Sequence, residues 1–340
     1  MALSTVICLW SCTAGAQTLS VDGTRFGIDG RATRLLLFIS YFDGLHASKL
    51  NDDLDYLSVT LRFDGIRVLP NWQRRDAGYC PIESDETTLF DAAGNVRGDT
   101  TPASGPLKRL LDLIDAARAR TLVVDVSFTR ETVPGLNEEN YVRAATRTAK
   151  LLAPYRNVLI DLQNEIDKNA LSEAQTTRLR EAIAAVDAAR VIVASRGGPA
   201  PDVIAYNQRI GATAIAYHDP RVAQWAEQTA AAVAPLAASG RPVYLQEPQA
   251  WNSGMTICHR VEGKTLDADG DAAHFRGAVT HARDAGAAAW TFHTRQGFRL
   301  DTADGIRSRV QANSSERALL EGAAGAAALS TIASGSATTR

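Results

Sequence analysis

The feature that most constrains the fold of this chain is an alternation between short apolar runs and longer amphipathic stretches. Eight apolar runs have the length of strands: Leu35–Tyr41, Gly65–Leu69, Thr121–Phe128, Asn157–Gln163, Arg190–Ser195, Thr213–Tyr217, Pro242–Gln246 and Ala287–Phe292. The stretches that follow them have the apolar spacing of helices: residues 49–62, 106–119, 138–153, 172–188, 201–209, 221–238, 271–285 and 314–324. Because each strand is followed by a helix, the pattern predicts a parallel sheet covered by helices.

Eight such units favour an α/β fold of the (β/α)8 TIM-barrel type over an open doubly wound sheet. The open sheet typically carries a glycine-rich GxGxxG turn after its first strand, and none follows Leu35–Tyr41. Ahead of the barrel, Thr18–Thr33 contains two Asp-Gly turn signals, which predict a short N-terminal hairpin that plugs the barrel bottom. We therefore expect one domain over residues 17–325 and a flexible tail over residues 326–340, which are rich in small and polar residues.

The composition excludes several classes of partner. The 340 residues include 36 Lys and Arg against 38 Asp and Glu, with no long run of like charge, which argues against a nucleic-acid partner. No stretch approaches the roughly 18 consecutive apolar residues that a membrane span needs. With 45% hydrophobic residues the chain can still bury a sizeable core.

The N-terminal segment bears on localisation. Residues 1–16 are apolar and end in Ala14-Gly15-Ala16, like a secretory signal peptide, which predicts a secreted or periplasmic protein; a buried or disordered N-terminus is the alternative. After cleavage, Cys80 and Cys258 would remain as a candidate pair. No Cys/His spacing typical of zinc occurs, so we expect neither a metal nor another cofactor.

Two glutamates stand at the ends of predicted strands. The segment VLIDLQNEID (Val158–Asp167) runs from an apolar strand into Asn164-Glu165, and VYLQEPQAW (Val243–Trp251) does the same at Glu247. Because the carboxyl ends of barrel strands meet on one face, these side chains can converge there. Paired carboxylates across a cavity are the groups that glycosidic-bond cleavage requires, and a gap of about 5–5.5 Å predicts retention of configuration, whereas about 6.5–9.5 Å predicts inversion.

On these residues the chain resembles the clan A glycoside hydrolases, a cellulase-like superfamily of retaining (β/α)8 enzymes. That clan has an Asn-Glu acid/base after the fourth strand and a glutamate nucleophile after the seventh. Arg67 on the second predicted strand, His218 after the sixth and Trp290 near the end of the eighth are further similarities, in the same strand order. The resemblance covers about residues 20–325.

The resemblance implies a residue for each role. Glu165 would be the acid/base and Glu247 the nucleophile, while Asn164 would hydrogen-bond the sugar 2-hydroxyl and Arg67 would keep Glu247 ionised. Trp290 would form the floor under the reacting sugar.

The implied activity is retaining hydrolysis of β-glycosidic bonds in an oligo- or polysaccharide. The alternatives are a barrel that binds glycans without cleaving them, and a metal-dependent barrel hydrolase. The second would need a cluster such as His-x-His on the first strand, where His46 stands alone. Two departures from cellulase-like members leave the sugar open. Ser127 is near the end of the third strand where a histidine is usual, and Asp219-Pro220 follows His218 in place of a tyrosine.

Each assignment has a structural alternative. Asn164-Glu165 could cap the following helix. Arg67 could pair with Asp125 or Asp161, and His218 could be an ordinary rim histidine. For Trp72, Trp251 and Tyr41, we weigh lining the sugar cleft against packing within loops and turns.

Overall fold

The computed structural model describes residues 17–72, 88–100, 104–168, 171–218, 225–248, 256–257, 260–261, 268–298, 300, 304–312 and 314–321. The segment 1–16, Cys80, Trp251, Cys258 and the tail 326–340 lie outside the described residues, so the predictions about them stay predictions. Within the described ranges, no helix has both the length and the apolar character needed to cross a bilayer.

The centre of the molecule is an eight-stranded sheet of parallel neighbours in the order β8-β7-β6-β5-β4-β13-β10-β9. Its strands are β4 (Leu36–Ser40), β5 (Gly65–Val68), β6 (Val123–Ser127), β7 (Val158–Asp161), β8 (Val191–Val193), β9 (Ile215–His218), β10 (Val243–Glu247) and β13 (Ala289–Phe292). A parallel bridge between Arg196 and Tyr217 joins the two outermost strands, so the sheet closes into a barrel. The predicted (β/α)8 class is confirmed.

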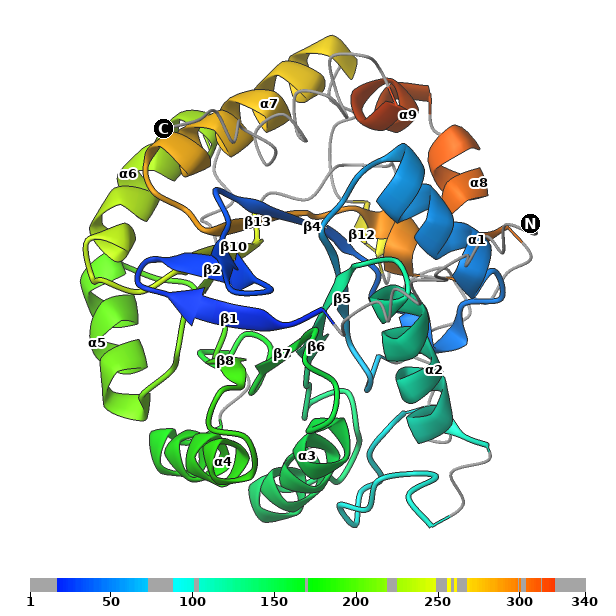
Figure 1. Ribbon diagram of the computed structural model, residues 1–340, viewed down its shortest axis with the longest axis vertical. Coiled ribbons are helices and arrows are strands. Elements are labelled where there is room, and N and C mark those ends of the chain that lie inside the picture. The colour runs from blue at the N-terminus through cyan, green and yellow to red at the C-terminus, as the bar shows by residue number, and fades with distance from the viewer. Residues whose placement is uncertain are drawn as a thin grey trace, which may run out of the picture.

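Helices surround the strands as an outer ring (Figure 1). They are α1 (Leu50–Asp55), α2 (Pro106–Arg118), α3 (Glu138–Leu152), α4 (Glu173–Val186), α5 (Ala200–Ile210), α6 (Trp225–Ala237), α7 (Ala268–Asp284), α8 (Gly305–Ala312) and α9 (Ser314–Glu321). Shorter turns are η1 (Gly44–His46), the π-helical η2 (Tyr56–Thr60) and η4 (Arg295–Phe298), and β11 (Thr256–Ile257) pairs with β12 (Arg260–Val261). Helix α8 was not expected from the sequence.

The predicted hairpin is present as a small antiparallel sheet of β1 (Leu19–Asp22), β2 (Arg25–Ile28) and β3 (Arg31–Ala32). It lies across the opening of the barrel that faces the viewer in Figure 1. Leu19 and Phe26 are buried in the apolar cluster that fills this end of the barrel interior. The hairpin therefore closes the end of the barrel where the strands begin.

The alternating direction of the side chains along each strand divides the core into two layers. The side chains of one parity point outward and form a large apolar layer with the helices, and those of the other parity point into the barrel. Toward the carboxyl ends of the strands the inward side chains become polar, with Arg67, Asp125, Asp161 and Gln246 all fully buried. Buried polar groups need partners, and these residues supply one another at the end where barrel enzymes place their sites.

A buried carboxyl group attaches the last helix to the end of the eighth strand. Glu316 of α9 is fully buried, where it accepts hydrogen bonds from the Thr294 hydroxyl and, at 2.9 Å, from the Gln296 amide. Burial outweighs these hydrogen bonds and raises the pKa of Glu316 to about 7, from an ordinary value of 4.5. The folded protein therefore holds this proton more tightly than the unfolded chain does.

The pH dependence of stability should report this proton. Since the folded-state pKa of Glu316 is raised, the contribution of its proton to the free energy of unfolding is fully present below about pH 4.5. This contribution is lost as the pH rises through about 7, and the free energy of unfolding falls by about 3 kcal/mol. Glu316→Gln should lack this part of the pH dependence in urea unfolding between pH 4.5 and 8. Glu173→Gln, at an exposed carboxylate paired with Arg209, is the matched control and should follow the parent. Parallel curves for Glu316→Gln and the parent would contradict the assignment.

Candidate active site

The Arg67 guanidinium of β5 is the centre of the polar cluster. It is fully buried and donates to three groups: Nη1 to Glu247 Oε1 at 2.6 Å, Nη2 to Asn164 Oδ1 at 2.6 Å and Nε to Ser127 Oγ at 3.0 Å. These partners come from β10, the turn after β7 and the end of β6. One planar cation therefore fixes side chains that are far apart in the sequence.

Two more carboxyl groups lie beneath this cluster. They bear on the structural alternative for Arg67, an ion pair with Asp125 or Asp161. Arg67 Nε is 3.5 Å from Asp125 Oδ2, and Nη2 is 3.9 Å from Asp161 Oδ2, so Arg67 faces both of the predicted structural partners as well as Glu247. Burial is the largest influence on both aspartates. It raises the pKa of Asp125 to about 6 and that of Asp161 as well, against the opposing effect of Arg67. One cation does not compensate three buried carboxylates.

A register shift places two consecutive residues of β10 inside the barrel. The pairing of β10 with β9 changes register between Leu245 and Glu247, which makes Gln246 the extra residue of a bulge. Gln246 Nε2 donates to Asp125 Oδ2 at 2.8 Å and to Asp161 Oδ2 at 3.1 Å, while Glu247 faces Arg67. Strict alternation from the inward-facing Tyr244 would place Gln246 inside and turn Glu247 outward, so the bulge is what brings Glu247 into the site. Gln246 was not among the residues singled out from the sequence.

Glu165 sits in a strained turn after β7. Its φ of 49° lies in the left-handed region, which non-glycine residues rarely adopt and which recurs at functional sites. Its backbone N–H donates to Ser195 Oγ at 3.0 Å. The next helix, α4, begins at Glu173 and is capped by Ser172, so the helix-cap alternative for Asn164-Glu165 is wrong.

The Glu165 carboxylate reaches back toward the barrel axis, with 23% of its side chain exposed. Burial alone would raise its pKa, but hydrogen bonding to His218 and to Lys168 outweighs burial and the charge of Glu247, and lowers the pKa to about 2. Glu165 therefore carries a negative charge at neutral pH in the substrate-free protein.

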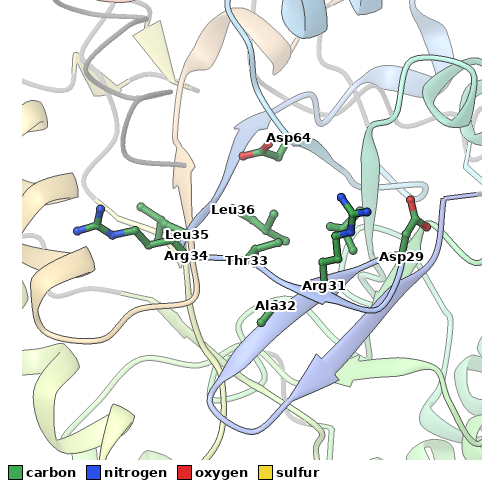
Figure 2. Close-up of a pocket in the computed structure, with 9 residues that line it drawn as sticks. Asp29, Arg31, Ala32, Thr33, Arg34, Leu35, Leu36 and Asp64 are labelled. Carbon is green, nitrogen blue, oxygen red and sulfur yellow. The ribbon is translucent and has the colours of Figure 1, made fainter. Parts of the chain in front are cut away.

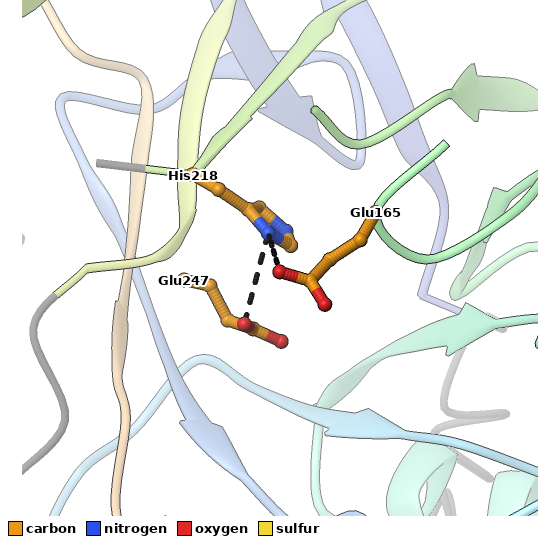
Figure 3. A group of neighbouring side chains, drawn as sticks. All are labelled: Glu165, His218 and Glu247. Atoms are coloured by element: carbon orange, nitrogen blue, oxygen red, sulfur yellow. Dashed lines mark ion pairs between the residues drawn. The ribbon is translucent and has the colours of Figure 1, made fainter. Parts of the chain in front are cut away.

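His218 lies between the two glutamates (Figure 3). Its Nδ1 is 3.6 Å from Glu247 Oε2 and 3.8 Å from Glu165 Oε1, and its Nε2 is 3.1 Å from Gln246 Oε1. The ring is 8% exposed. The expected rim histidine is thus in the site, in contact range of both carboxylates.

Among the described residues, these three side chains are also the group spaced to hold a metal ion. One ligand atom from each of Glu165, His218 and Glu247 lies within 4.8 Å of the others. Two cations already accompany the carboxylates, Arg67 on Glu247 and Lys168 on Glu165, which opposes binding of a further divalent cation. The donor set therefore fits proton chemistry better than a resident metal.

An aromatic cluster borders the Arg67 side of the site. The Phe42 ring stacks on Phe298 with centroids 4.5 Å apart, meets Trp72 edge-on at 5.4 Å and lies 5.1 Å from the Arg67 guanidinium carbon. Trp72 is half-buried and donates from Nε1 to the Phe298 carbonyl at 3.0 Å. Trp72 is thus anchored by loop packing and also lies beside the site. Phe42, which the sequence analysis overlooked, is the ring next to Arg67.

Two predicted site residues do not reach the cleft, and both predictions are wrong for the same reason. Tyr41 is fully buried, where its hydroxyl donates to Asp53 Oδ2 at 2.9 Å beneath the helices. Trp290 is fully buried against Phe275 of α7, with ring centroids 6.2 Å apart. On β13 the neighbouring Thr291 points inward, with its hydroxyl donating to the Tyr244 hydroxyl. Tyr41 and Trp290 have the outward parity of their strands.

A pocket of about 640 Å³ lies at the other end of the barrel, between the hairpin and the start of β4. Its lining includes Asp29, Arg31, Arg34 and Asp64. Figure 2 shows the two arginine side chains pointing away from each other. Because these guanidinium groups do not converge, we place the candidate site at the opposite end, around Glu165 and Glu247.

No family model matches the chain, and no curated protein matches it. Solved structures do resemble it. One described as a glycoside hydrolase aligns with a TM-score of 0.64 and 13% identity over 89% of this chain and 73% of its own. The catalytic domain of a Thermobifida fusca endoglucanase in complex with cellotetraose aligns at 0.52 and 19% identity, over 81% of this chain and 84% of its own. The chain therefore shares its barrel fold with these two proteins.

A third structure with this fold is a glycoside hydrolase family 5 protein from Bacteroides vulgatus. It aligns with a TM-score of 0.59 and 14% identity over 84% of this chain. This chain spans only 63% of the length of that protein. At such identities the likeness to these structures establishes the architecture, and the chemistry has to be argued from the residues.

Removing the Arg67 guanidinium should destabilise the folded protein. Arg67→Met leaves the buried carboxylates without their cation, and we expect the free energy of unfolding to fall by about 3–5 kcal/mol, measured by urea denaturation at pH 7. Arg178→Met, at an exposed pair with Glu139, is the control and should change the midpoint little. A midpoint for Arg67→Met equal to that of the control would contradict the central role of Arg67.

Proposed function

We propose that this protein is a retaining glycoside hydrolase that cleaves β-glycosidic bonds of an oligo- or polysaccharide by double displacement. The observation that carries the proposal is the convergence of Glu165 and Glu247 at the carboxyl end of the barrel, with Arg67 bound to one of them. The clan A fold supports it, and one structure with that fold holds cellotetraose. The sugar and the linkage remain outside the proposal.

The separation of the two carboxylates supports retention. One oxygen of Glu165 and one of Glu247 lie within 4.8 Å of each other. Retaining enzymes keep their carboxyl groups about 5–5.5 Å apart, whereas inverting enzymes need about 6.5–9.5 Å to admit a water between carboxylate and sugar. The gap in this protein is therefore closer to the spacing of retaining enzymes than to that of inverting enzymes.

The nucleophile in this scheme is Glu247. Its Oε1 is held by Arg67 at 2.6 Å, so Oε2 is the oxygen directed at the anomeric carbon. In the first step the bond from the anomeric carbon to the leaving oxygen breaks, a bond to Glu247 forms, and the leaving oxygen takes a proton from Glu165. In the second step a water attacks the anomeric carbon, gives its proton to Glu165, and releases the sugar from Glu247.

The contacts of Asn164 suit a supporting role. Its Oδ1 accepts from Arg67 Nη2 at 2.6 Å, which fixes the orientation of the amide. The amide nitrogen is then the group that would meet the sugar 2-hydroxyl. Hydrogen bonds at this hydroxyl strengthen in the transition state of glycoside cleavage.

Alanine variants of the two glutamates should separate their roles. On an aryl β-glycoside, Glu247→Ala should abolish turnover, and added azide should restore it with formation of the α-glycosyl azide. Glu165→Ala should lose about 10²–10⁴-fold on substrates with a poor leaving group, and azide should give the β-glycosyl azide, because it then attacks the glycosyl-enzyme. Product analysis by ¹H NMR distinguishes the two.

Two outcomes would overturn this assignment. If parent and variants bind an oligosaccharide equally and none turns over any β-glycoside in a broad panel, the protein is a glycan-binding barrel. If azide gives the same anomer with both variants, the roles are assigned wrongly.

Chelation tests the metal-dependent alternative. Because Arg67 and Lys168 accompany the carboxylates, we expect dialysis against EDTA to leave the hydrolysis rate within about twofold of the untreated protein. Loss of activity that returns on adding a divalent cation would instead support a metal-dependent hydrolase.

A further inference from the structure

The orientation of the Gln246 amide is dictated by what surrounds it. Its Nε2 lies 2.8 Å from Asp125 Oδ2, 3.1 Å from Asp161 Oδ2 and 3.2 Å from Ser127 Oγ. Asp125 also accepts from the Tyr244 hydroxyl, and Asp161 accepts from the Ser195 backbone N–H, so both aspartates act as acceptors and the NH₂ group has to face them. The carbonyl oxygen of Gln246 then faces His218.

This orientation determines the proton on His218 Nε2. Gln246 Oε1 is 3.1 Å from Nε2 and can only accept, so Nε2 carries a hydrogen and donates it. In the neutral ring the other nitrogen, Nδ1, then presents a lone pair. That nitrogen is buried, with carboxylate oxygens of Glu247 and Glu165 at 3.6 Å and 3.8 Å.

A lone pair on Nδ1 would face negative charge on two sides. Glu247 Oε2 is 3.6 Å away and Glu165 Oε1 is 3.8 Å away. The charge of Asp161 on β7 also interacts with His218, and the exposed Lys168 pairs with Glu165. Glu165, Glu247 and Asp161 are three anionic groups against two cations, the exposed Lys168 and the buried Arg67. The excess of negative charge favours a proton in the gap between Nδ1 and a carboxylate.

We propose, resting on the function proposed above, that His218 Nδ1 and Glu165 share the proton used by the acid/base, and that Gln246 positions His218 for this by fixing the hydrogen on Nε2. The low pKa of Glu165 fits this arrangement, because hydrogen bonding to His218 is the largest influence that lowers it. The substrate-free protein therefore stores the catalytic proton on the pair rather than on the carboxyl alone.

The proton transfers balance over one catalytic cycle. In the first step the proton passes from His218 Nδ1 to Glu165 and on to the leaving oxygen, while the sugar moves from that oxygen to Glu247. His218 is left neutral, with its hydrogen on Nε2. In the second step the attacking water gives a proton to Glu165, from which it returns to Nδ1, and the bond to Glu247 breaks. The negative charge of Glu247 is absent only in the glycosyl-enzyme, when Nδ1 has given up its proton.

The state of each ring nitrogen can be read by ¹⁵N NMR of protein labelled at histidine, with the His218 signals assigned by their loss in His218→Gln. At pH 6 we expect Nε2 to appear protonated and hydrogen-bonded, and Nδ1 to appear protonated in part. Glu165→Gln should move Nδ1 toward the unprotonated range and leave Nε2 unchanged. His46, bound to Asp43 at 2.7 Å, is the internal control and should not move. An unprotonated Nε2, or an Nδ1 signal indifferent to Glu165→Gln, would overturn the proposal.

Variants at Gln246 test the positioning role by kinetics. Gln246→Met removes the acceptor for the His218 Nε2–H, at a position that does not contact the sugar. We expect kcat to fall at least about 10-fold while KM stays within about 3-fold of the parent value. The alkaline limb of the pH profile of kcat/KM should move to lower pH. Gln246→Glu keeps an acceptor oxygen and, when protonated, a donor for one aspartate, so it should recover activity selectively at low pH. A purely structural Gln246 predicts equal loss at every pH, and this result would contradict the role.

The two proposals can fail separately, since the NMR experiment needs no turnover. The expected ¹⁵N pattern in a protein inactive on every glycoside would refute the hydrolase function and leave the shared proton standing. Active enzyme with the wrong tautomer of His218 would refute only the shared proton.

Discussion

The burial of one guanidinium at the centre of the barrel is the interaction on which the rest of the site depends. Arg67 binds Glu247, Asn164 and Ser127 at 2.6–3.0 Å and has no exposed surface. Burying a charge is unfavourable unless partners replace water. Three strands and one turn therefore have to present polar side chains to the same point, which accounts for the polar interior at this end of an otherwise apolar barrel.

The same requirement explains the excess of acid around Arg67. Asp125, Asp161 and Glu247 exceed the single positive charge, so the burial that raises the pKa of the first two is only partly offset. Gln246 relieves this strain by donating to both aspartates, and in doing so it presents its carbonyl oxygen to His218. The hydrogen bonds that the two buried aspartates accept from Gln246 thus determine which nitrogen of His218 carries the hydrogen.

Much of this architecture follows from the sequence. All eight predicted barrel strands and the hairpin are present, because apolar period and length are local signals. Glu165, Glu247, Arg67 and His218 converge as expected because they stand at comparable depths in parallel strands.

Alternation within a strand, read position by position, would also have excluded Tyr41 and Trp290. Both lie one residue away from the inward-facing series that includes Phe38 on β4 and Ala289 on β13. What alternation could not supply is the bulge in β10, since nothing local in VYLQEP signals an extra residue. Without this bulge Glu247 would face outward, whereas Gln246 has the inward parity of Tyr244 and its role follows only from the three-dimensional contacts.

The proposed double displacement requires Glu165 and Glu247 to act together across one narrow gap. The configuration of the first product released from a β-glycoside, followed by ¹H NMR before mutarotation, tests this mechanism. We expect the β-anomer, formed through a glycosyl-enzyme on Glu247. Initial release of the α-anomer would instead show that water attacks the sugar directly.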